Sequence, residues 1–489
     1  MYRLSAVIVL FSLVVLAACK HEAQPPATPA DGNYPPAIAK IILTRCATAG
    51  CHNAASYQGA GGLRLDSWDN LFNGGSNGAA IVPYSIDNSP LLYFINTDAS
   101  LGPVAQPTMP YNGGTLSKDD YMTIRNWVAA GAPDKNGNIP FASNPDTRQK
   151  TYLTQQGCDL LAVIDNEKKV VMRYIPIGTV PGAIESPHCV RVSADGAYAY
   201  VSFSGGNSPY VQKIDTRTDK IVDSVYVGLG SWNVFGLSAD SKKMMLSNWM
   251  SNGNMLYINN NPMSVITSIG SINDFYYPHG VAANAAFDTF FVTGQYGNFV
   301  HKFTLNSGTI QRISIDGDPV TTNHVRDPHE IIMTPDYSKY FLTCEVSNEV
   351  RVMDAHADTL IKAIPVGIFP QELAISRSKP YVLVTCMEDT SAYPGFKGSV
   401  YIINYNTLET TRIDGRFYQP HGITVDDKNG TFLVASRNSN PNGPAPHHAS
   451  SCSGRNGWYN IYNLNTLQPA DSRRFEVTVE PYSADTRFK

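Results

Sequence analysis

Cys46, Cys51 and His52 are the first residues in the chain whose types and spacing could do cofactor chemistry. Two thiols can add across the two vinyl groups of a porphyrin, and a histidine next to the second thiol can present a ring nitrogen to the iron. The usual spacer between such cysteines is two residues, whereas the spacer here has four. Gly50 would ease an outward bulge of this longer spacer. The motif therefore predicts covalent attachment of haem.

A zinc site and a disulfide are the alternatives for the same motif. Zinc would require two more Cys or His at short spacing, and none lies between His52 and Cys158. A disulfide would leave the adjacent histidine unexplained. Outside the motif and the leader five cysteines remain, which cannot all pair: Cys158, Cys189, Cys344, Cys386 and Cys452. We expect Cys189, Cys344 and Cys386 to be buried in strands and the chain not to be a disulfide scaffold.

A helix is predicted immediately before the motif. Pro36 can open it, because the first amide of a helix has no partner within the helix. Ile38, Ile41 and Ile42 then form an apolar stripe that leads directly into Cys46. A helix that enters the attachment site in this way would position the first thiol.

A second helix is predicted after a loop rich in proline and glycine. Ser117 and Asp120 have the spacing of an N-terminal capping box, and the helix should stop at Gly131. Met109 lies between prolines on the loop before this helix. A lone methionine is normally core filler, but on such a loop it is better explained as a haem ligand. Met122, within the helix, is the fallback ligand.

Residues 38–132 resemble a bacterial cytochrome c domain of the kind with a four-residue spacer. The matching elements are Cys46…Cys51-His52, Leu63-Arg64-Leu65, Ile81-Val82-Pro83, Ser89-Pro90-Leu91-Leu92, Met109-Pro110 and Trp127…Gly131-Ala132. The resemblance implies a small all-α domain in which Cys46 and Cys51 hold the haem. It also implies that His52 is the proximal ligand and Met109 the second axial ligand. A thioether ligand favours ferrous iron and raises the reduction potential.

The first residues predict export from the cytoplasm. Arg3 precedes the apolar run Ala6–Ala18, which is too short to span a bilayer as a mature helix and fits a secretory signal. The run ends in Leu16-Ala17-Ala18-Cys19, which resembles the lipobox of bacterial lipoproteins. The resemblance implies cleavage before Cys19, acylation of that cysteine, and a place in the bacterial cell envelope, facing the periplasm or the cell surface. An ordinary signal peptide with a chance cysteine is the alternative.

Length and composition predict more than one domain and no nucleic-acid partner. The chain has 489 residues, 43% of them hydrophobic, and a net charge of −4 with both signs interspersed, so no basic face is expected. We divide it into a signal peptide (1–18), a tether (19–33), a cytochrome c domain (34–135), a linker (136–149) and a β-rich domain (150–489). The only contact expected with a membrane is the lipid anchor.

The β-rich part contains a repeat that begins with Pro, or with Trp232 in one case. Successive starts at 187, 232, 278, 328, 370 and 420 are separated by 45, 46, 50, 42 and 50 residues. A period in this range with four strands per repeat predicts propeller blades. The strands before residue 187 lack an inner strand, and residue 481 begins an inner strand alone, so the two chain segments should combine into a seventh blade. The pattern resembles the YncE-like, YVTN-repeat β-propeller family, a likeness that carries little about activity.

Alignment of the blades places one residue of each directly after the start of the inner strand. These residues should surround the mouth of the central channel: His188, Asn233, His279, His329, Gln371, His421 and Tyr482. Loops expected on the same face carry His324 and, between residues 437 and 457, His447, His448 and Cys452.

Clustered imidazoles suit copper or zinc. The arrangement resembles nitrous oxide reductase, whose copper site lies in a seven-bladed propeller and is held by histidines, although the further His-rich signatures of that family are absent here. The favoured alternative is that these residues cap strand ends by hydrogen bonding to neighbouring blades.

Together these features predict an exported, lipid-anchored c-type cytochrome that transfers electrons through one haem. The propeller would bind a redox partner protein or a small-molecule redox substrate. One alternative is a propeller-based copper oxidoreductase that uses the haem as an electron relay, and another is a surface-binding module without enzymatic activity. An iron with both axial positions filled does not readily bind substrate, so any substrate chemistry would lie on the propeller or in a partner.

Overall fold

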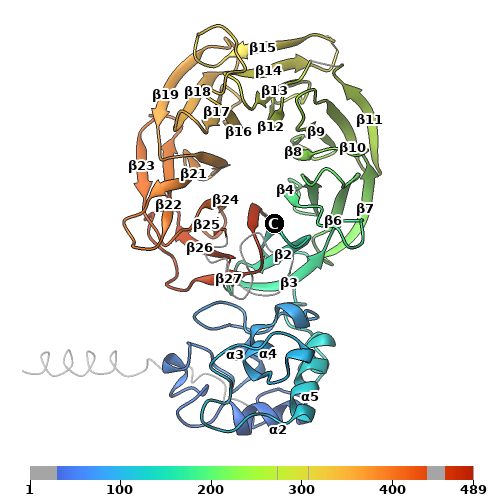
Figure 1. The fold of residues 1–489 in the computed structure, drawn as a ribbon, viewed down its shortest axis with the longest axis vertical. Coiled ribbons are helices and arrows are strands. Elements are labelled where there is room, and N and C mark those ends of the chain that lie inside the picture. Colours follow the sequence, from blue (N-terminus) through green and yellow to red (C-terminus); the bar gives the residue numbers. More distant parts are fainter. Residues whose placement is uncertain (1–29, 272–273, 307, 438–456, 488–489) are drawn as a thin grey trace, which may run out of the picture.

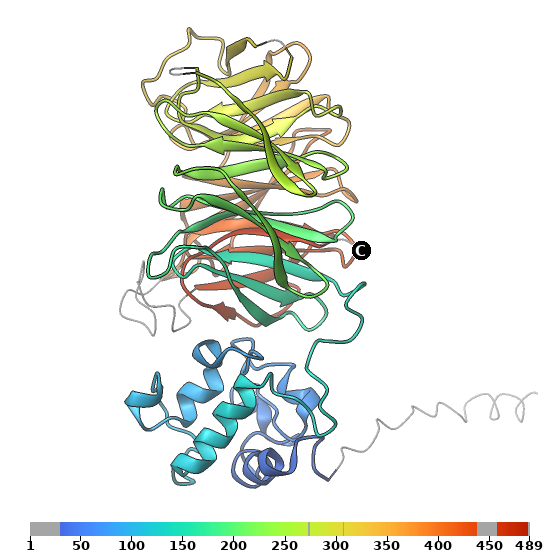
Figure 2. The same ribbon diagram turned by 90° about the vertical axis from the view of Figure 1, so that its right-hand side faces the viewer.

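The computed structural model describes residues 30–271, 274–306, 308–437 and 457–487. A ring of β-sheets lies above a smaller helical unit, and the two are in contact (Figures 1 and 2). Cys19, His447, His448 and Cys452 lie outside the described residues. None of the helices described is both long and apolar enough to cross a membrane.

The helical unit contains only short helices joined by irregular loops. Its α-helices are α2 (Pro36–Arg45), α3 (Trp68–Leu71), α4 (Pro90–Ile95) and α5 (Lys118–Ala129), and its 3-10 turns are η1 (Tyr57–Gly59), η2 (Ile86–Asn88) and η3 (Ala99–Leu101). The two helices expected before Cys46 and after Ser117 are therefore present. The all-α description holds only loosely, because much of the unit between them is loop.

Helices α2 and α5 pack together to form the core of this unit. Ile42 on α2 and Ile124 and Val128 on α5 are fully buried there. The N-terminus of α5 is capped by the Ser117 hydroxyl, which accepts a hydrogen bond from the Asp120 amide at 3.1 Å. This cap fixes where α5 begins, and therefore how much chain is left to form the loop that carries Met109.

The β-rich part forms seven four-stranded antiparallel sheets arranged as blades. The innermost strands are β28 (Pro481–Thr486), β4 (Pro187–Val192), β8 (Trp232–Leu237), β12 (Pro278–Ala283), β16 (Pro328–Met333), β20 (Pro370–Ile375) and β24 (Pro420–Asp426). The second strands are β1 (Lys150–Gln155), β5 (Tyr198–Phe203), β9 (Lys243–Asn248), β13 (Thr289–Gly294), β17 (Lys339–Cys344), β21 (Tyr381–Thr390) and β25 (Thr431–Ser436).

The third strands are mostly buried, whereas most of the outermost strands are exposed to solvent. The third strands are β2 (Leu160–Asp165), β6 (Tyr210–Asp215), β10 (Met255–Asn260), β14 (Phe299–Thr304), β18 (Glu349–Asp354), β22 (Lys397–Asn404) and β26 (Gly457–Asn463). The outermost strands are β3 (Val170–Pro176), β7 (Lys220–Tyr226), β11 (Met263–Ile269), β15 (Ile310–Ser314), β19 (Leu360–Pro365), β23 (Thr410–Ile413) and β27 (Phe475–Val477). The seven-bladed propeller predicted from the repeat is confirmed.

The first and last strands of the propeller close the ring. Strand β28 pairs with β1 in the order β28-β1-β2-β3, with Leu153 opposite Ala484 and Tyr152 opposite Asp485. The composite blade expected from the two chain segments therefore exists. Apolar side chains of neighbouring blades fill the space between them, as where Tyr152 and Leu161 pack with Val190 and Val201.

The helical unit docks on the outer edge of two blades. The amides of Arg474 and Glu476 donate to the carbonyls of Ser76 and Asn77 at 3.3 and 3.0 Å. Val82 is buried in the same apolar cluster as Phe475 of β27. The contact joins the predicted cytochrome unit to the propeller through both backbone hydrogen bonds and apolar packing.

A buried ion pair links the composite blade to its neighbour. Lys150 Nζ donates to Asp219 Oδ2 at 2.8 Å and to the Thr216 carbonyl at 2.7 Å, and the two charged side chains are 2% and 8% exposed. Tyr152 also donates its hydroxyl proton to Asp219, at 2.8 Å. The Asp219 carboxylate is therefore the counter-ion of a lysine that has almost no access to water.

Asp219→Ala is expected to lower the free energy of unfolding by about 3–5 kcal/mol, because it leaves an uncompensated buried charge. Urea denaturation followed by circular dichroism measures the change. Lys118→Met provides the control, because Lys118 and Asp98 form a pair whose side chains are 67% and 42% exposed. The control should change stability by less than about 1 kcal/mol. Equal losses in the two variants would show that burial of the pair is not what matters.

Candidate functional site

The haem-binding motif begins at the end of α2. The last residue of this helix is Arg45, and the amide of Cys46 still donates to the Ile42 carbonyl at 2.9 Å. The Cys46 side chain is buried in the core of the helical unit, and burial raises the pKa of its thiol to about 11. Cys51 is half-buried, and both cysteines are free thiols. A disulfide between them, which was one alternative, is not formed in this structure.

The orientation of His52 is set by one hydrogen bond. Its Nδ1 lies 2.9 Å from the Leu63 carbonyl oxygen, which can only accept, so Nδ1 carries the proton. In the neutral imidazole the unprotonated nitrogen is then Nε2. A histidine that donates one ring N–H to a backbone carbonyl and keeps the other nitrogen bare is in the form that ligates a metal. The Leu65 amide donates to the His52 carbonyl at 2.8 Å and holds the backbone as well.

The loop that carries Met109 is tied to the end of α2. Arg45 donates through Nη2 to the carbonyls of Gly113 and Gly114 at 3.2 and 3.1 Å, and the Met109 amide donates to the Phe94 carbonyl at 2.7 Å. The Met109 side chain is half-buried against the same core that contains Cys46. Met122, the fallback ligand, also packs against this core, from within α5.

These side chains fit a haem group better than a structural zinc ion. Among the described residues, the only group of three metal-ligating side chains close enough to share an ion lies elsewhere, in the propeller. The motif offers two free thiols and one imidazole with a bare nitrogen, and a methionine lies on a neighbouring loop. This set suits covalent attachment with one imidazole and one thioether ligand. The roles of Cys46, Cys51, His52 and Met109 remain predictions.

The aligned propeller residues lie where the repeat predicts them, as the second residue of each inner strand. Five of them have aromatic or imidazole rings, and these form a closed circuit of contacts. The ring centroids are 5.5 Å apart for His188 and His279, 4.0 Å for His279 and His329, and 6.2 Å for His329 and His421. Tyr482 completes the circuit at 3.6 Å from His421 and 4.6 Å from His188. We call these five residues the channel ring.

The imidazoles of the channel ring are buried. His188, His279, His329 and His421 are 6%, 2%, 3% and 1% exposed. Burial lowers the pKa of His188 to about 3 and those of His279 and His421 well below the usual value, and the charge of neighbouring histidines adds to the effect. These three side chains are therefore neutral near pH 7, which is the form that binds metal ions.

Carboxylates that the sequence analysis did not single out line the channel beside this ring. Glu330 follows His329 and Glu372 follows Gln371, and burial raises the pKa of both, that of Glu372 to about 8. The Glu345 carboxylate lies 3.7 Å from His329 Nε2 and accepts a hydrogen bond from Gln371 at 2.6 Å. The sequence contains a signal for these carboxylates, because an acidic residue directly follows the aligned residue in two blades.

His324 does not belong to the channel ring. Its Nδ1 lies 3.0 Å from Asp327 Oδ2, its ring packs against Tyr296, and its side chain is 54% exposed. The expectation that His324 joins the other histidines is therefore not met in this structure.

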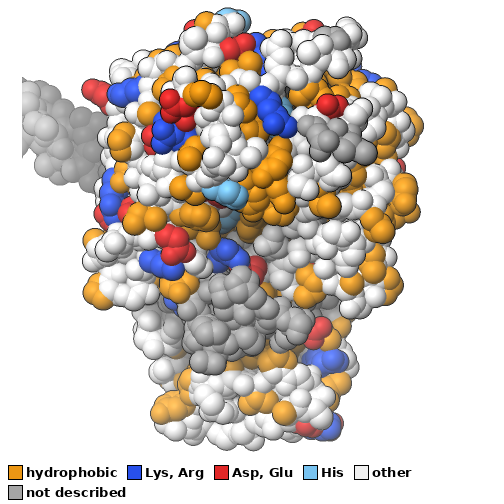
Figure 3. Space-filling model, turned by 45° about the horizontal axis from the view of Figure 1, so that its top comes forward, with side chains coloured by type: hydrophobic (Ala, Val, Ile, Leu, Met, Phe, Trp, Pro, Cys, Tyr) orange, Lys and Arg blue, Asp and Glu red, His pale blue; other side chains and the backbone are white. Residues whose placement is uncertain are grey.

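Histidine atoms reach the surface near the middle of the propeller face drawn in Figure 3, next to apolar side chains. Cys189, Cys344 and Cys386 are buried, as expected.

Comparison with known proteins supports a cytochrome c-like domain. The family model for planctomycete cytochrome C matches residues 49–103. The match includes Cys51 and His52 and ends before Met109. With the free thiols and the orientation of His52, it indicates a haem-associated function for the helical unit.

A curated relative shares only part of its length with this chain. Antigen Lp49 of Leptospira interrogans is 27% identical over 126 residues, which is 23% of this chain and 26% of the relative. The chain therefore spans about a quarter of the curated relative that it matches. The name of the relative describes an antigen and no chemistry.

Comparison with solved structures supports the propeller fold in one case. A functionally unknown protein from Desulfotomaculum acetoxidans aligns with a TM-score of 0.50 and 12% identity over 68% of this chain and 99% of the other. Dihydro-heme d1 dehydrogenase NirN in complex with DHE aligns with a TM-score of 0.45 and 13% identity over 78% of this chain and 88% of the other. At these identities the first likeness concerns the fold alone, and the second is too weak to carry an argument.

His301 on β14 shows what burial alone does to a histidine outside the channel ring. It is fully buried between Phe275 and Phe299, and burial lowers its pKa to about 3. In the unfolded chain a histidine titrates near pH 6.5. Between about pH 6.5 and pH 3 the unfolded state therefore binds one more proton than the folded state, and stability falls as the pH falls.

His301→Phe should reduce the loss of stability on acidification, by up to about 1.4 kcal/mol per pH unit in this range. Urea denaturation at several pH values between 6.5 and 4.5 measures the slope. His356→Gln removes an exposed histidine and should leave the slope as in the wild type. If the slope of His301→Phe were identical to that of the wild type, the lowered pKa of His301 in the folded state would be contradicted.

Proposed function

We propose that the protein is an exported, lipid-anchored c-type cytochrome that transfers single electrons through one covalently bound haem. The observation that carries the proposal is His52, which lies in the segment that matches cytochrome C and keeps Nε2 bare by donating Nδ1–H to the Leu63 carbonyl. Cys46 and Cys51 come shortly before His52 in the chain, and Cys51 lies within the matched segment. Haem, when bound, would supply a one-electron couple.

The chain's own residues would perform five tasks around that group. Cys46 and Cys51 would hold it covalently, and His52 Nε2 and the Met109 sulfur would ligate its iron. Leu63 orients His52 through its carbonyl, at 2.9 Å. Arg45 holds the loop after Met109 against the end of α2, which limits how far the thioether can move away. The apolar core beneath Cys46 excludes water from one side of the site.

The proposed place of action is the bacterial cell envelope. The apolar run Ala6–Ala18 and the sequence that ends in Cys19 support export and acylation. Haem is attached to c-type cytochromes outside the cytoplasm, so the two proposals are consistent. The propeller would bind a redox partner protein or a small-molecule redox substrate, which would reach the haem while the lipid holds the protein at the membrane.

A second candidate function is an oxidoreductase in which the propeller carries the reaction and the haem relays electrons. The specific observation in its favour is the channel ring, because four buried histidines meet where a cap for strand ends would need none. An electron carrier needs only a docking surface on the propeller. The two functions therefore differ in what the channel binds.

Met109→Ala should abolish the near-infrared band of oxidised protein that arises from thioether ligation, because the iron loses its sulfur ligand. Met122→Ala removes the fallback ligand and is expected to keep the band. Absorption spectra of the purified full chain in the oxidised state make the comparison. If Met109→Ala kept the band and Met122→Ala lost it, Met122 on α5 and not Met109 would be the sulfur ligand.

The wild-type haem should take up one electron per chain in a redox titration and, when reduced, should bind no carbon monoxide, because neither axial position is open. Met109→Ala provides the positive control and should bind carbon monoxide. Rapid binding of carbon monoxide by the wild type would contradict the electron-transfer role and would point to substrate chemistry at the iron.

A further inference from the structure

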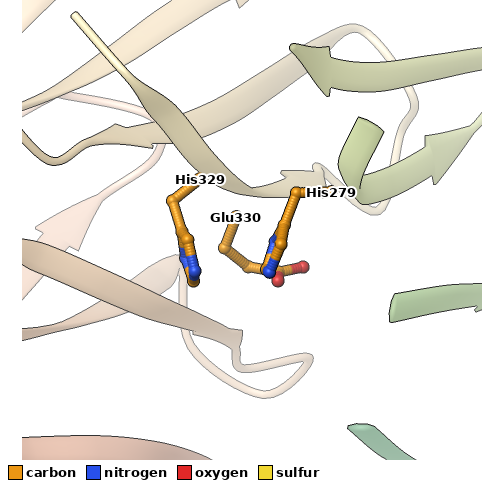
Figure 4. A group of neighbouring side chains, drawn as sticks. All are labelled: His279, His329 and Glu330. Atoms are coloured by element: carbon orange, nitrogen blue, oxygen red, sulfur yellow. The ribbon is translucent and has the colours of Figure 1, made fainter. Parts of the chain in front are cut away.

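We propose that His188, His279, His329 and His421, together with Glu330, bind one divalent transition-metal ion of the copper or zinc type in the propeller channel. The site does not depend on the haem, because it lies in the other unit of the chain. Figure 4 shows three of the side chains, with the rings of His279 and His329 turned the same way and the Glu330 carboxylate beside them.

The distances between the candidate ligand atoms are close to those of a metal site. His188 Nε2 and His279 Nε2 are 3.4 Å apart. Two nitrogens bound to one tetrahedral zinc ion at about 2.0–2.1 Å are about 3.3 Å apart, which is close to this separation. Gln156 Nε2 donates to His188 Nδ1 at 3.2 Å, so the His188 proton is on Nε2 and is donated to His279, and binding of an ion would displace that proton. The ligand atoms of His279, His329 and Glu330 all lie within 4.8 Å of one another. These three side chains would have to draw together on binding.

Several buried polar atoms in this group have no hydrogen-bond partner among the described residues. They are His279 Nδ1, His329 Nδ1, His421 Nε2 and Glu330 Oε2. A buried polar atom without a partner is costly, and one explanation of such atoms is an ion that occupies the space between them. One ion could satisfy His329 Nδ1, His421 Nε2 and Glu330 Oε2, and His279 would bind it through a single nitrogen.

His421 has the hydrogen bond that a ligating histidine needs. Its Nδ1 lies 3.0 Å from the Tyr482 carbonyl oxygen, which can only accept, so the proton is on Nδ1 and Nε2 is bare. The Nε2 atom is buried and has no partner among the described residues. The same geometry orients His52 in the helical unit, where a metal ligand is expected for independent reasons.

Strand capping does not explain every histidine of the channel ring. Gln371 donates to Glu345 of the neighbouring blade at 2.6 Å, and His421 makes a similar bond to the Tyr482 carbonyl at 3.0 Å. His279 and His329 occupy the equivalent position in their blades, yet the Nδ1 atom of each has no partner among the described residues. Capping therefore leaves these two imidazoles unexplained.

The acidic side chains of the channel add oxygen donors to this group. Glu330, Glu345 and Glu372 are buried there, and the ligand atom of Glu330 lies within 4.8 Å of those of His279 and His329. A set dominated by imidazole nitrogen selects copper or zinc over magnesium or calcium, which prefer oxygen ligands.

The test is the metal content of the full-length protein, purified without a polyhistidine tag. The protein is treated with a chelator, reloaded with Cu²⁺ or with Zn²⁺ in separate samples, and freed of excess ion. We expect one equivalent of copper or zinc per chain in addition to the haem iron, and the better retained of the two ions identifies the metal. Iron alone in both reloaded samples would overturn the proposal.

Three variants locate the ion: His279→Gln, His329→Gln and Glu330→Gln. Each is expected to weaken metal binding by about tenfold or more. His301→Gln is the matched control, because His301 is equally buried but lies outside the channel ring, and it should keep the full equivalent. Circular dichroism and the haem spectrum check that each variant is folded. Full metal content in all three variants would place the ion elsewhere and would also overturn the proposal.

A second measurement does not depend on the yield of each variant. Zn²⁺ should raise the melting temperature of the chelator-treated wild type, because a ligand that binds only the folded state stabilises it. The rise should be absent in His279→Gln and present in His301→Gln. The haem couple and the thioether band should be the same in all of these proteins, so failure of this site and failure of the proposed function are separate results.

Discussion

The pairing of β28 with β1 is the interaction on which the rest of the propeller depends. Strand β28 comes from the last residues described, and β1 follows the linker after the helical unit, so the pairing joins segments more than 300 residues apart. It places Tyr482 between His421 on one side and His188 on the other. Without this pairing the circuit of rings would be open at that point, and the four histidines would lose their common centre.

The two candidate sites of the molecule use the same device on different backbones. In each, a histidine donates Nδ1–H to a backbone carbonyl, from His52 to Leu63 and from His421 to Tyr482. In the helical unit the carbonyl belongs to an irregular loop, and in the propeller it belongs to the inner strand of the adjacent blade. A carbonyl fixed in this way selects one tautomer of the imidazole and one direction for the other nitrogen.

The repeat in the sequence was sufficient for the propeller, because the period, the turn residues and the missing inner strand together define seven blades. It also predicted the second residue of each inner strand as a channel residue. Regular alternation places His329 and Glu330 on opposite sides of a strand, so alternation could not predict that both join one group. The pairing of β16 with β17 shifts register between Pro328 and Ile331, and a similar shift occurs between Pro370 and Leu373.

The helical unit was less predictable beyond its two main helices. Capping and apolar spacing identified α2 and α5, because both signals are local. The contacts of Arg45 with the carbonyls of Gly113 and Gly114 join residues 68 and 69 positions apart in the chain and have no signature in a single sequence. His447, His448 and Cys452 stay predictions, since they lie outside the described residues.

The docking of the helical unit has a consequence for how the whole chain assembles. Asn73 accepts a hydrogen bond at its side-chain oxygen from Lys168, next to the composite blade, and at its carbonyl from Arg473, next to β27. One residue thus bridges the two blades that meet where the propeller closes. Docking of the helical unit and closure of the ring are therefore thermodynamically coupled, because contacts that form only when both are complete stabilise both.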